Sequence, residues 1–265
     1  YKWRKGFSIM IKFLTVTDLH YCKKDDPIGR RHCLSAEKLK RIIDEHSDGC
    51  DFIVDLGDTA DGFEGSGNQE TLMEEIAEIL KNSGLPYYCA IGNHDTSLPK
   101  NKIEKILNMP NRYYSFDTKD YTCLILDANM NDPLKPYPDK EILWTETYLD
   151  PEQLKWAAQT IAAASKPVLI FCHELFVFEK FENKNDHIIM NRDDAVDIFE
   201  KSGKVKAVFC GHYHFGGYVK HNGIHYTVFH SLCLREDLTC AVVTIDDGKI
   251  EIEGFGLQPS MNFEF

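Results

Sequence analysis

The sequence predicts a layered α/β domain, with its strands either in one mixed sheet or in two sheets packed face to face. Three observations favour this class. Apolar, β-branched runs alternate with segments of helical periodicity as far as Cys210, and short strand-like segments then follow one another without a helix between them. The 265 residues are 43% hydrophobic, enough for one large core, and no repeat or low-complexity linker divides them. We therefore expect a single domain over residues 1–265, with a core from about residue 11 to residue 254.

The strands expected in the alternating part are short runs rich in Val, Ile, Leu and Phe, as buried strands usually are. They cover residues 11–17, 52–56, 87–91, 123–126, 168–172 and 205–210. The later segments are separated by turn sequences such as His221-Asn222-Gly223, which predicts hairpins. These later strands cover residues 217–220, 224–230, 241–245 and 249–253.

The expected helices place apolar residues three or four positions apart. They cover residues 34–46, 70–82, 151–164 and 193–201. Gly84 and Pro86 end the second of these patterns, and Pro151 occupies the first turn of the third, where a missing N–H group costs nothing.

Charge and cysteine content narrow the classes of function and location. The 42 acidic and 30 basic residues give a formal charge of −12, which disfavours an extended nucleic-acid-binding surface. No stretch is long and apolar enough to predict a membrane span, and residues 1–10 lack the apolar centre of a signal peptide. The nine cysteines are odd in number and form no CxxC pair, so we interpret them as reduced core thiols and expect a cytoplasmic location. The chain starts at Tyr1, which leaves room for a leader removed before that residue.

Five short segments end apolar runs with side chains that bind metal ions. They are Asp18-Leu19-His20, Gly57-Asp58-Thr59-Ala60-Asp61, Gly92-Asn93-His94-Asp95, Cys172-His173-Glu174 and Gly211-His212-Tyr213-His214. Each segment alone is weak support, because Gly, Asn and Asp also favour ordinary turns. All five follow predicted strands, whose ends meet in a crevice in open α/β sheets. Their carboxylate, carboxamide and imidazole groups are enough for two adjacent Mn, Fe, Zn or Ni ions.

The order of these motifs resembles the calcineurin-like metallophosphoesterase superfamily: DxH, GDxxD, GNHD, a lone His after a strand, and GHxH. The resemblance covers residues 12–230 and implies a four-layer fold, in which two mixed sheets form a sandwich flanked by helices. It also implies a dinuclear centre. One metal ion, divalent or trivalent, would be held by Asp18, His20, Asp58 and His214. The second would be held by Asp58, Asn93, His173 and His212, with Asp58 bridging the pair.

Such a centre implies hydrolysis of a phosphorus ester by a metal-bound hydroxide. A bridging carboxylate offsets the repulsion between two cations about 3.5 to 4 Å apart. His94 lies next to the ligand Asn93, and we expect it to be the catalytic side chain that protonates the departing oxygen. Asp61 and Asp95 are interpreted as partners that orient imidazoles or cap helices.

Motif details favour phosphodiester or pyrophosphate bonds of small nucleotide-like substrates. Protein Ser/Thr phosphatases carry Arg and Glu where this chain has Gly62 and Asp95. The sequences GDTAD and IGNHD, with residues 219–232, resemble the cyclic nucleotide phosphodiesterases. Residues 191–195 and the sequence GHYHFGGY resemble the manganese-dependent ADP-ribose/CDP-alcohol diphosphatases. A phosphomonoesterase and a protein phosphatase of the same superfamily remain the alternatives.

Two long segments are candidates for substrate recognition by stacking on a base, a contact that contributes about 1 to 3 kcal/mol in proteins that bind single strands. Residues 128–150 hold Tyr137 and Trp144, and residues 174–192 hold Phe176, Phe178 and Phe181. Covering a sheet edge is the alternative role for these aromatic residues. Arg192, or the nearby Lys180 and Lys184, is the candidate contact for a second phosphate.

Two further hypotheses belong to other classes of protein. A non-catalytic metal-binding scaffold is expected to lack a ligand or His94, and none is missing here. A mononuclear zinc protein that used His212 and His214 would leave Asp18, Asn93 and His173 unexplained. The remaining histidines, His32, His46, His187, His221, His225 and His230, are interpreted as ordinary surface or core residues. The sequence leaves the metal identity and the oligomeric state open.

Overall fold

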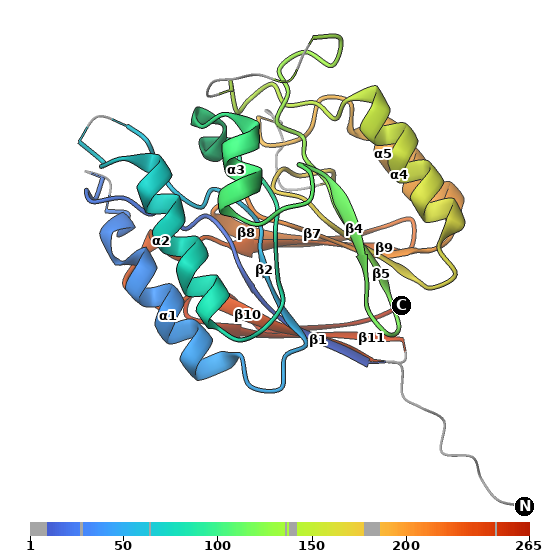
Figure 1. Cartoon of the computed structure of the whole chain (residues 1–265). Coiled ribbons are helices and arrows are strands. Elements are labelled where there is room, and N and C mark those ends of the chain that lie inside the picture. The colour runs from blue at the N-terminus through green and yellow to red at the C-terminus, as the bar shows by residue number, and fades with distance from the viewer. Residues whose placement is uncertain are drawn as a thin grey trace, which may run out of the picture.

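Two six-stranded mixed β-sheets form the centre of the molecule (Figure 1). The computed structural model describes residues 10–26, 29–63, 65–135, 137, 142–177, 186–246 and 248–265. The predicted sandwich of two mixed sheets flanked by helices is confirmed, and of the two arrangements left open by periodicity it is the one with two sheets.

In the first sheet, a parallel part and an antiparallel part meet at the strand β1. The strand order is β12 (Met261–Glu264), β11 (Lys249–Phe255), β10 (Cys240–Asp246), β1 (Met10–Val16), β2 (Phe52–Asp55) and β3 (Tyr87–Cys89). β1, β2 and β3 run parallel, whereas β10, β11 and β12 pair antiparallel.

The second sheet has a parallel centre with an antiparallel strand at each edge. Its order is β4 (Tyr114–Asp117), β5 (Thr122–Ile125), β6 (Val168–Phe171), β7 (Val205–Cys210), β9 (Ile224–His230) and β8 (Phe215–His221). β5, β6, β7 and β9 run parallel. The turn at Asn222 and Gly223, both with positive φ, joins β8 to β9 as the predicted hairpin.

Helices cover the sandwich in two groups, which lie on opposite sides in Figure 1. α1 (Ser35–His46) packs against α2 (Gln69–Asn82), and the short α3 (Lys100–Ile106) packs on α2. α4 (Pro151–Ala163) packs against α5 (Arg192–Ser202). Side-chain caps fix two of the helix starts, because Asn68 accepts from Thr71 N–H at 3.0 Å and Asp150 accepts from Gln153 N–H at 2.8 Å.

Successive side chains of the central strands point to opposite faces of the sheet, and so contribute to two apolar cores. Phe171 of β6 and Phe209 of β7 point between the sheets, where each ring centroid lies 5.5 Å from that of Phe13 on β1. Their neighbours Ile170 and Val208 point the other way, toward α4 and α5. Because side chains alternate in strands, one run of apolar residues supplies both faces.

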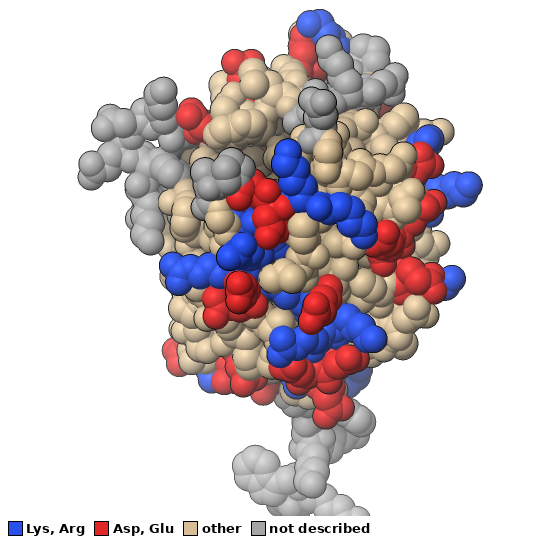
Figure 2. Space-filling model, turned by 90° about the vertical axis from the view of Figure 1, so that its left-hand side faces the viewer, with Lys and Arg blue, Asp and Glu red and all other residues tan. Residues whose placement is uncertain are grey.

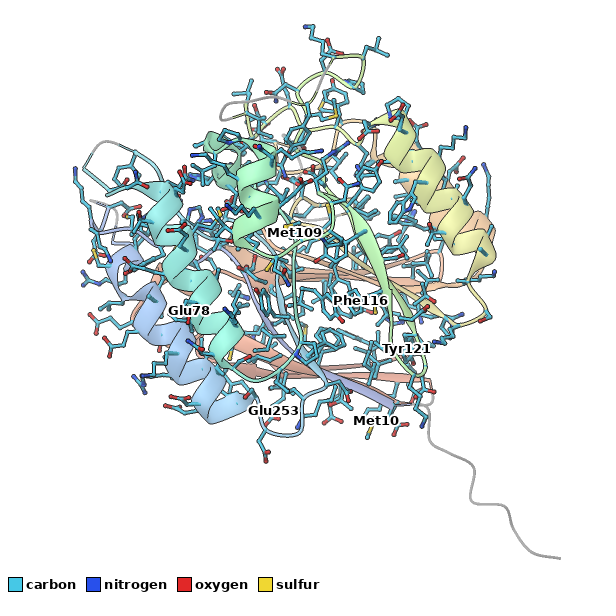
Figure 3. The ribbon with its side chains drawn as sticks, viewed as in Figure 1. Met10, Glu78, Met109, Phe116, Tyr121 and Glu253 are labelled. Atoms are coloured by element: carbon cyan, nitrogen blue, oxygen red, sulfur yellow. The ribbon has the colours of Figure 1, made fainter. Side chains whose placement is uncertain are left out.

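The side chains drawn in Figure 3 show the same division between inside and outside. Phe116 of β4 lies between the two sheets, stacked on Tyr88 with ring centroids 3.4 Å apart, whereas Glu78 of α2 lies on the outer helix layer. Figure 2 shows the face on the left of Figure 1, where Lys and Arg side chains are interspersed with Asp and Glu. The face shown therefore carries both signs of charge and no extended basic surface.

Most predicted elements are present, with ends shifted by a few residues. Among the α-helices and strands, three short ones were not predicted: α3, β4 and β12. Within the described residues, no helix is long and apolar enough to span a membrane. All nine cysteines are free, and only Cys33 among them is exposed.

Candidate metal centre

All seven predicted metal ligands lie at one end of the sandwich, in loops that follow the carboxyl ends of five strands. β1, β2 and β3 of the first sheet lead to Asp18, His20, Asp58 and Asn93, and β6 and β7 of the second lead to His173, His212 and His214. The centre is thus assembled from segments almost 200 residues apart, for example His20 and His214, whose Nε2 atoms are 3.2 Å apart.

The backbone is left-handed at four of these ligands. φ is 52° at Asp18, 46° at His20, 54° at Asp58 and 64° at His212, and only two other non-glycine residues of the described chain have positive φ. This conformation costs an L-residue about 1 to 2 kcal/mol, and it persists where surrounding contacts fix it, typically at functional sites. Gly211 shows how tight the packing is, because a Cβ atom there would lie 1.9 Å from Thr17 Oγ1.

The first group of ligand atoms surrounds Asp18 Oδ1. His214 Nε2 lies 3.3 Å and His20 Nε2 3.7 Å from this oxygen. Asp58 Oδ2 is 3.5 Å from His20 Nε2. Two carboxylates and two imidazoles, the set that the resemblance implied for the first metal ion, therefore lie next to one another around His20 Nε2 and Asp18 Oδ1.

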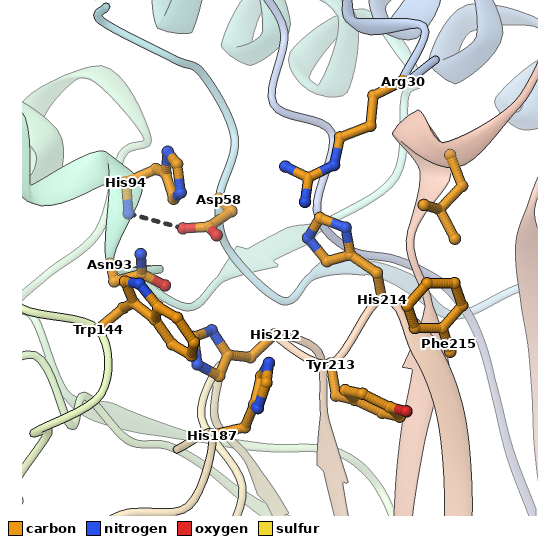
Figure 4. Close-up of a pocket in the computed structure, with 11 residues that line it drawn as sticks. Arg30, Asp58, Asn93, His94, Trp144, His187, His212, Tyr213, His214 and Phe215 are labelled. Atoms are coloured by element: carbon orange, nitrogen blue, oxygen red, sulfur yellow. Dashed lines mark hydrogen bonds between the residues drawn. The ribbon is translucent and has the colours of Figure 1, made fainter. Parts of the chain in front are cut away.

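The second group of ligand atoms lies on the other side of Asp58. His173 Nε2 is 3.2 Å from Asp58 Oδ2 and 3.2 Å from His212 Nδ1. Asn93, which is 3% exposed, lines the cavity beside Asp58 (Figure 4). The same oxygen of Asp58 faces both groups, which is the position a bridging ligand requires.

Three buried polar atoms at the centre have no hydrogen-bond partner within the described residues. They are Asp18 Oδ1, Asn93 Oδ1 and His212 Nε2. A buried polar atom without a partner costs about 1 to 3 kcal/mol, so such atoms usually have a partner that the protein itself does not supply. Metal cations meet that need, and the carboxylate, amide and imidazole donors fit them.

The charges of the centre also suit cations. Burial raises the pKa of the Asp18 carboxyl, but the imidazoles of His214 and His20 outweigh burial and hold this pKa well below its usual value. Burial lowers the pKa of His212 and His214, which favours the neutral imidazoles that metal binding requires. At His173 burial is outweighed by the charge of Asp58, which raises its pKa to about 10.

Hydrogen bonds from the other ring nitrogens orient two of the imidazoles. His173 Nδ1 lies 2.8 Å from the carbonyl oxygen of Leu56, and His20 Nδ1 lies 2.9 Å from Asp61 Oδ1. Both rings therefore direct Nε2 at the metal centre, and the fixed tautomer follows from these contacts.

His94 shares Asp61 with His20. Its Nδ1 lies 2.8 Å from Asp61 Oδ1, and its backbone N–H donates to Asp58 Oδ1 at 2.8 Å. The side chain is 35% exposed and lines the cavity. The Asp61 carboxylate thus holds the His94 ring through Nδ1. Nε2 stays available to a ligand, which a residue that protonates a leaving group requires.

His32 was interpreted as an ordinary histidine, but it also lies in this network. It is 2% exposed, its ring centroid lies 5.6 Å from that of His20, and its Nδ1 lies 3.4 Å from Asp61 Oδ2. Three imidazoles thus surround Asp61. No sequence pattern marks His32, because its position follows a polar loop without periodicity.

Asp95 has a different role from Asp61, because it fixes backbone and not imidazoles. Its Oδ2 accepts from the N–H groups of Gly92 at 2.9 Å and Asp58 at 3.0 Å, and its Oδ1 accepts from Thr59 N–H at 2.9 Å. These bonds join the loop of Asp58 to the loop of Asn93, and so hold Asp58 in its left-handed conformation.

We predict that Asp95→Asn lowers the free energy of unfolding of the metal-free protein by about 3 kcal/mol, because an amide turns an N–H₂ group toward buried donors and leaves them unpaired. Urea denaturation measures this change. The matched control is Asp193→Asn, since Asp193 is 95% exposed on α5, and a surface change of this kind stays within about 0.5 kcal/mol. Equal stability of the two variants would remove the structural role of Asp95.

The ligands open into a cavity of about 560 Å³, within the usual range for small-molecule sites (Figure 4). Its walls carry Asp58, Asn93, His94, His212 and His214 of the centre, and also Arg30, Trp144, His187, Tyr213, Phe215 and Leu234. Trp144, a candidate for base stacking, lies on this wall. Arg30 and His187 were not predicted there.

The other candidate substrate contacts lie elsewhere. Phe176 is fully buried in the core beside Phe199, with ring centroids 5.3 Å apart. The ring of Tyr137 packs 4.9 Å from the guanidinium of Arg112, and Arg192 donates to the carbonyl of Phe176 at 3.3 Å. None of the three lines the cavity, and Phe178, Lys180, Phe181 and Lys184 lie outside the described residues.

Comparisons with known proteins agree with the fold and the centre. The family model described as calcineurin-like phosphoesterase matches residues 11–216, and the chain belongs to this family, whose members are generally hydrolases of phosphoester bonds. The chain is 24% identical over 304 residues to a manganese-dependent ADP-ribose/CDP-alcohol diphosphatase of Arabidopsis thaliana, covering 96% of this chain and 97% of that one.

The chain is also similar to a second curated protein in sequence and to a solved structure in fold. The chain is 21% identical over 231 residues to a probable cyclic nucleotide phosphodiesterase of Psychrobacter arcticus, covering 81% of this chain and 77% of that one. A dimetal phosphatase from Danio rerio has the same fold, with a TM-score of 0.83, 14% identity, and coverage of 97% of this chain and 99% of that one.

Proposed function

We propose that this protein is a dinuclear metal-dependent phosphoesterase that hydrolyses phosphodiester or pyrophosphate bonds of small nucleotide-like substrates. The observation that carries the proposal is the position of Asp58, whose Oδ2 lies 3.5 Å from His20 Nε2 and 3.2 Å from His173 Nε2. When bound, two ions such as Mn, Fe, Zn or Ni would supply Lewis-acid activation of a water molecule and neutralise charge on the phosphoryl oxygens.

The side chains around the ions carry the remaining steps. Asp58, held by the N–H group of His94, keeps the two ligand groups at a fixed separation. His94 donates a proton to the departing oxygen, and Asp61 keeps its ring in place. Trp144 on the cavity wall offers an aromatic face to a base.

A comparison of five compounds tests the reaction. With Mn added, we expect kcat/KM for bis-p-nitrophenyl phosphate, or for ADP-ribose, CDP-choline or cyclic AMP, to exceed that for p-nitrophenyl phosphate at least tenfold. The metal content of the purified protein should approach two ions per chain, and removal with EDTA should abolish turnover until metal is restored. A preference for the monoester would overturn the bond class and favour a phosphomonoesterase.

The same measurements separate the other classes of protein. A scaffold would bind metal without turnover, and a mononuclear zinc protein would hold one ion per chain. The geometry favours neither, because Asp58 and His94 are both in place and His173 and Asn93 face a second ligand group.

A further inference from the structure

Arg30 is the only Lys or Arg among the described residues that line the cavity. It comes from the loop between β1 and α1, and not from any of the five metal-binding motifs. The rest of the wall consists mainly of imidazole and aromatic side chains. Arg30 therefore brings a positive charge to the cavity wall from outside the five motifs.

Asp26 anchors the Arg30 side chain at its base. Arg30 Nε lies 3.5 Å from Asp26 Oδ2, and the backbone N–H of Arg30 donates to Asp26 Oδ1 at 3.0 Å. The Arg30 side chain is 30% exposed and that of Asp26 is 17% exposed. Because the contact with Asp26 engages the Nε side, the terminal amino groups are directed away from it, and Figure 4 shows them pointing into the space beside His214 and Asp58.

The position of Arg30 relative to the metal centre is informative. Arg30 and His214 line the same cavity, and in Figure 4 the guanidinium lies beside the His214 imidazole. In Figure 4, Trp144 and Arg30 lie on opposite sides of the metal ligands. A substrate with one phosphorus at the centre would thus have an aromatic wall on one side and a fixed cation on the other.

We propose that Arg30 binds a second phosphate of the substrate, so that the preferred substrates are pyrophosphate-linked nucleotides and not cyclic nucleotides. A guanidinium fork matches two phosphate oxygens, and such charge-assisted bonds are about twice as strong as neutral ones. A cyclic nucleotide has one phosphate, which the metal centre would engage, leaving Arg30 without a partner. The inference rests on the proposed function for the position of the first phosphate.

Binding of two probes to the Mn-loaded protein tests this role. α,β-Methylene-ADP carries two phosphorus groups and AMP carries one, so calorimetry of both isolates the second group. We expect Arg30→Gln to weaken α,β-methylene-ADP binding about tenfold or more, and AMP binding by less than about threefold. Arg30→Lys should recover part of the loss, because an ammonium keeps the charge but not the fork.

Arg31→Gln is the matched control. Arg31 is the next residue, carries the same charge, is 43% exposed and pairs with Asp25 and Glu236 away from the cavity wall. Both probes should bind this variant as they bind the wild type. If Arg30→Gln weakens the binding of both probes equally, Arg30 only attracts anions in general. If α,β-methylene-ADP binding is unchanged, Arg30 does not contact the second phosphate. Either result overturns the proposal.

Kinetics separate this proposal from the proposed function. Arg30→Gln should lower kcat/KM for both substrates unequally. The loss for ADP-ribose should be at least ten times the loss for bis-p-nitrophenyl phosphate, which has one phosphorus. If the wild type hydrolyses neither compound, the proposed function fails, while the two binding constants still decide the role of Arg30.

Discussion

Asp58→Asn is expected to lower phosphodiesterase turnover at least about a hundredfold through loss of metal. The change removes one negative charge and one oxygen donor from the residue that faces both ligand groups, at 3.5 Å from His20 Nε2 and 3.2 Å from His173 Nε2. Without the shared carboxylate, repulsion between two cations is no longer offset. The metal content after desalting, measured together with kcat, should fall from about two ions per chain to one or fewer.

The matched control for this variant is Asp197→Asn. Asp197 lies on α5, is 62% exposed, and pairs with Lys201 at 2.6 Å. It should retain both metal ions and full turnover, because exposed ion pairs contribute little. Near-wild-type activity of Asp58→Asn with two ions still bound would sink the assignment of Asp58 as the bridge.

His94→Ala is expected to lower turnover by a similar factor while both metal ions stay bound. His94 contacts Asp61 and lines the cavity, and a ring nitrogen of His94 lies within 4.8 Å of ligand atoms of His20 and Asp58, so metal retention in the variant separates an acid from a ligand. The loss should depend on the leaving group. Esters of p-nitrophenol, which departs easily as an anion, should lose less than esters of an alcohol, whose oxygen needs a proton.

Metal analysis and a series of leaving groups measure this effect, and His221→Ala serves as control. His221 is 43% exposed beside Glu200 at the β8–β9 turn, remote from the centre in the fold. A loss of metal in His94→Ala would assign this residue to the ligands. An equal loss with every leaving group would remove its role as an acid.

The structure brings the side chains of the five motifs together because each motif sits where an apolar strand ends. Strand ends are local features, and the parallel order of β1, β2 and β3 brings their loops together. The short elements were harder to predict. α3 buries only Ile103, and β4 buries only Tyr114, whose hydroxyl reaches the backbone of Cys89. Their stability comes from contacts with distant residues, which leave no periodicity.

The sequence predicted only part of the cavity wall, because loop residues also lack periodicity. Trp144 and Tyr137 belong to the same predicted segment, yet one lines the cavity and the other packs on Arg112. A loop has no repeating geometry that tells which side chain faces a ligand. Arg30 was missed because it lies in a polar stretch that shows neither a motif nor a pattern. The single-domain extent and the cytoplasmic location stay predictions.

The left-handed backbone at Asp18, His20, Asp58 and His212 has a consequence for metal exchange. Packing and hydrogen bonds, such as those that Asp95 accepts from the Asp58 loop, hold this backbone in place. In the proposed dinuclear site, replacing one transition metal by another should therefore require only adjustment of side-chain rotamers.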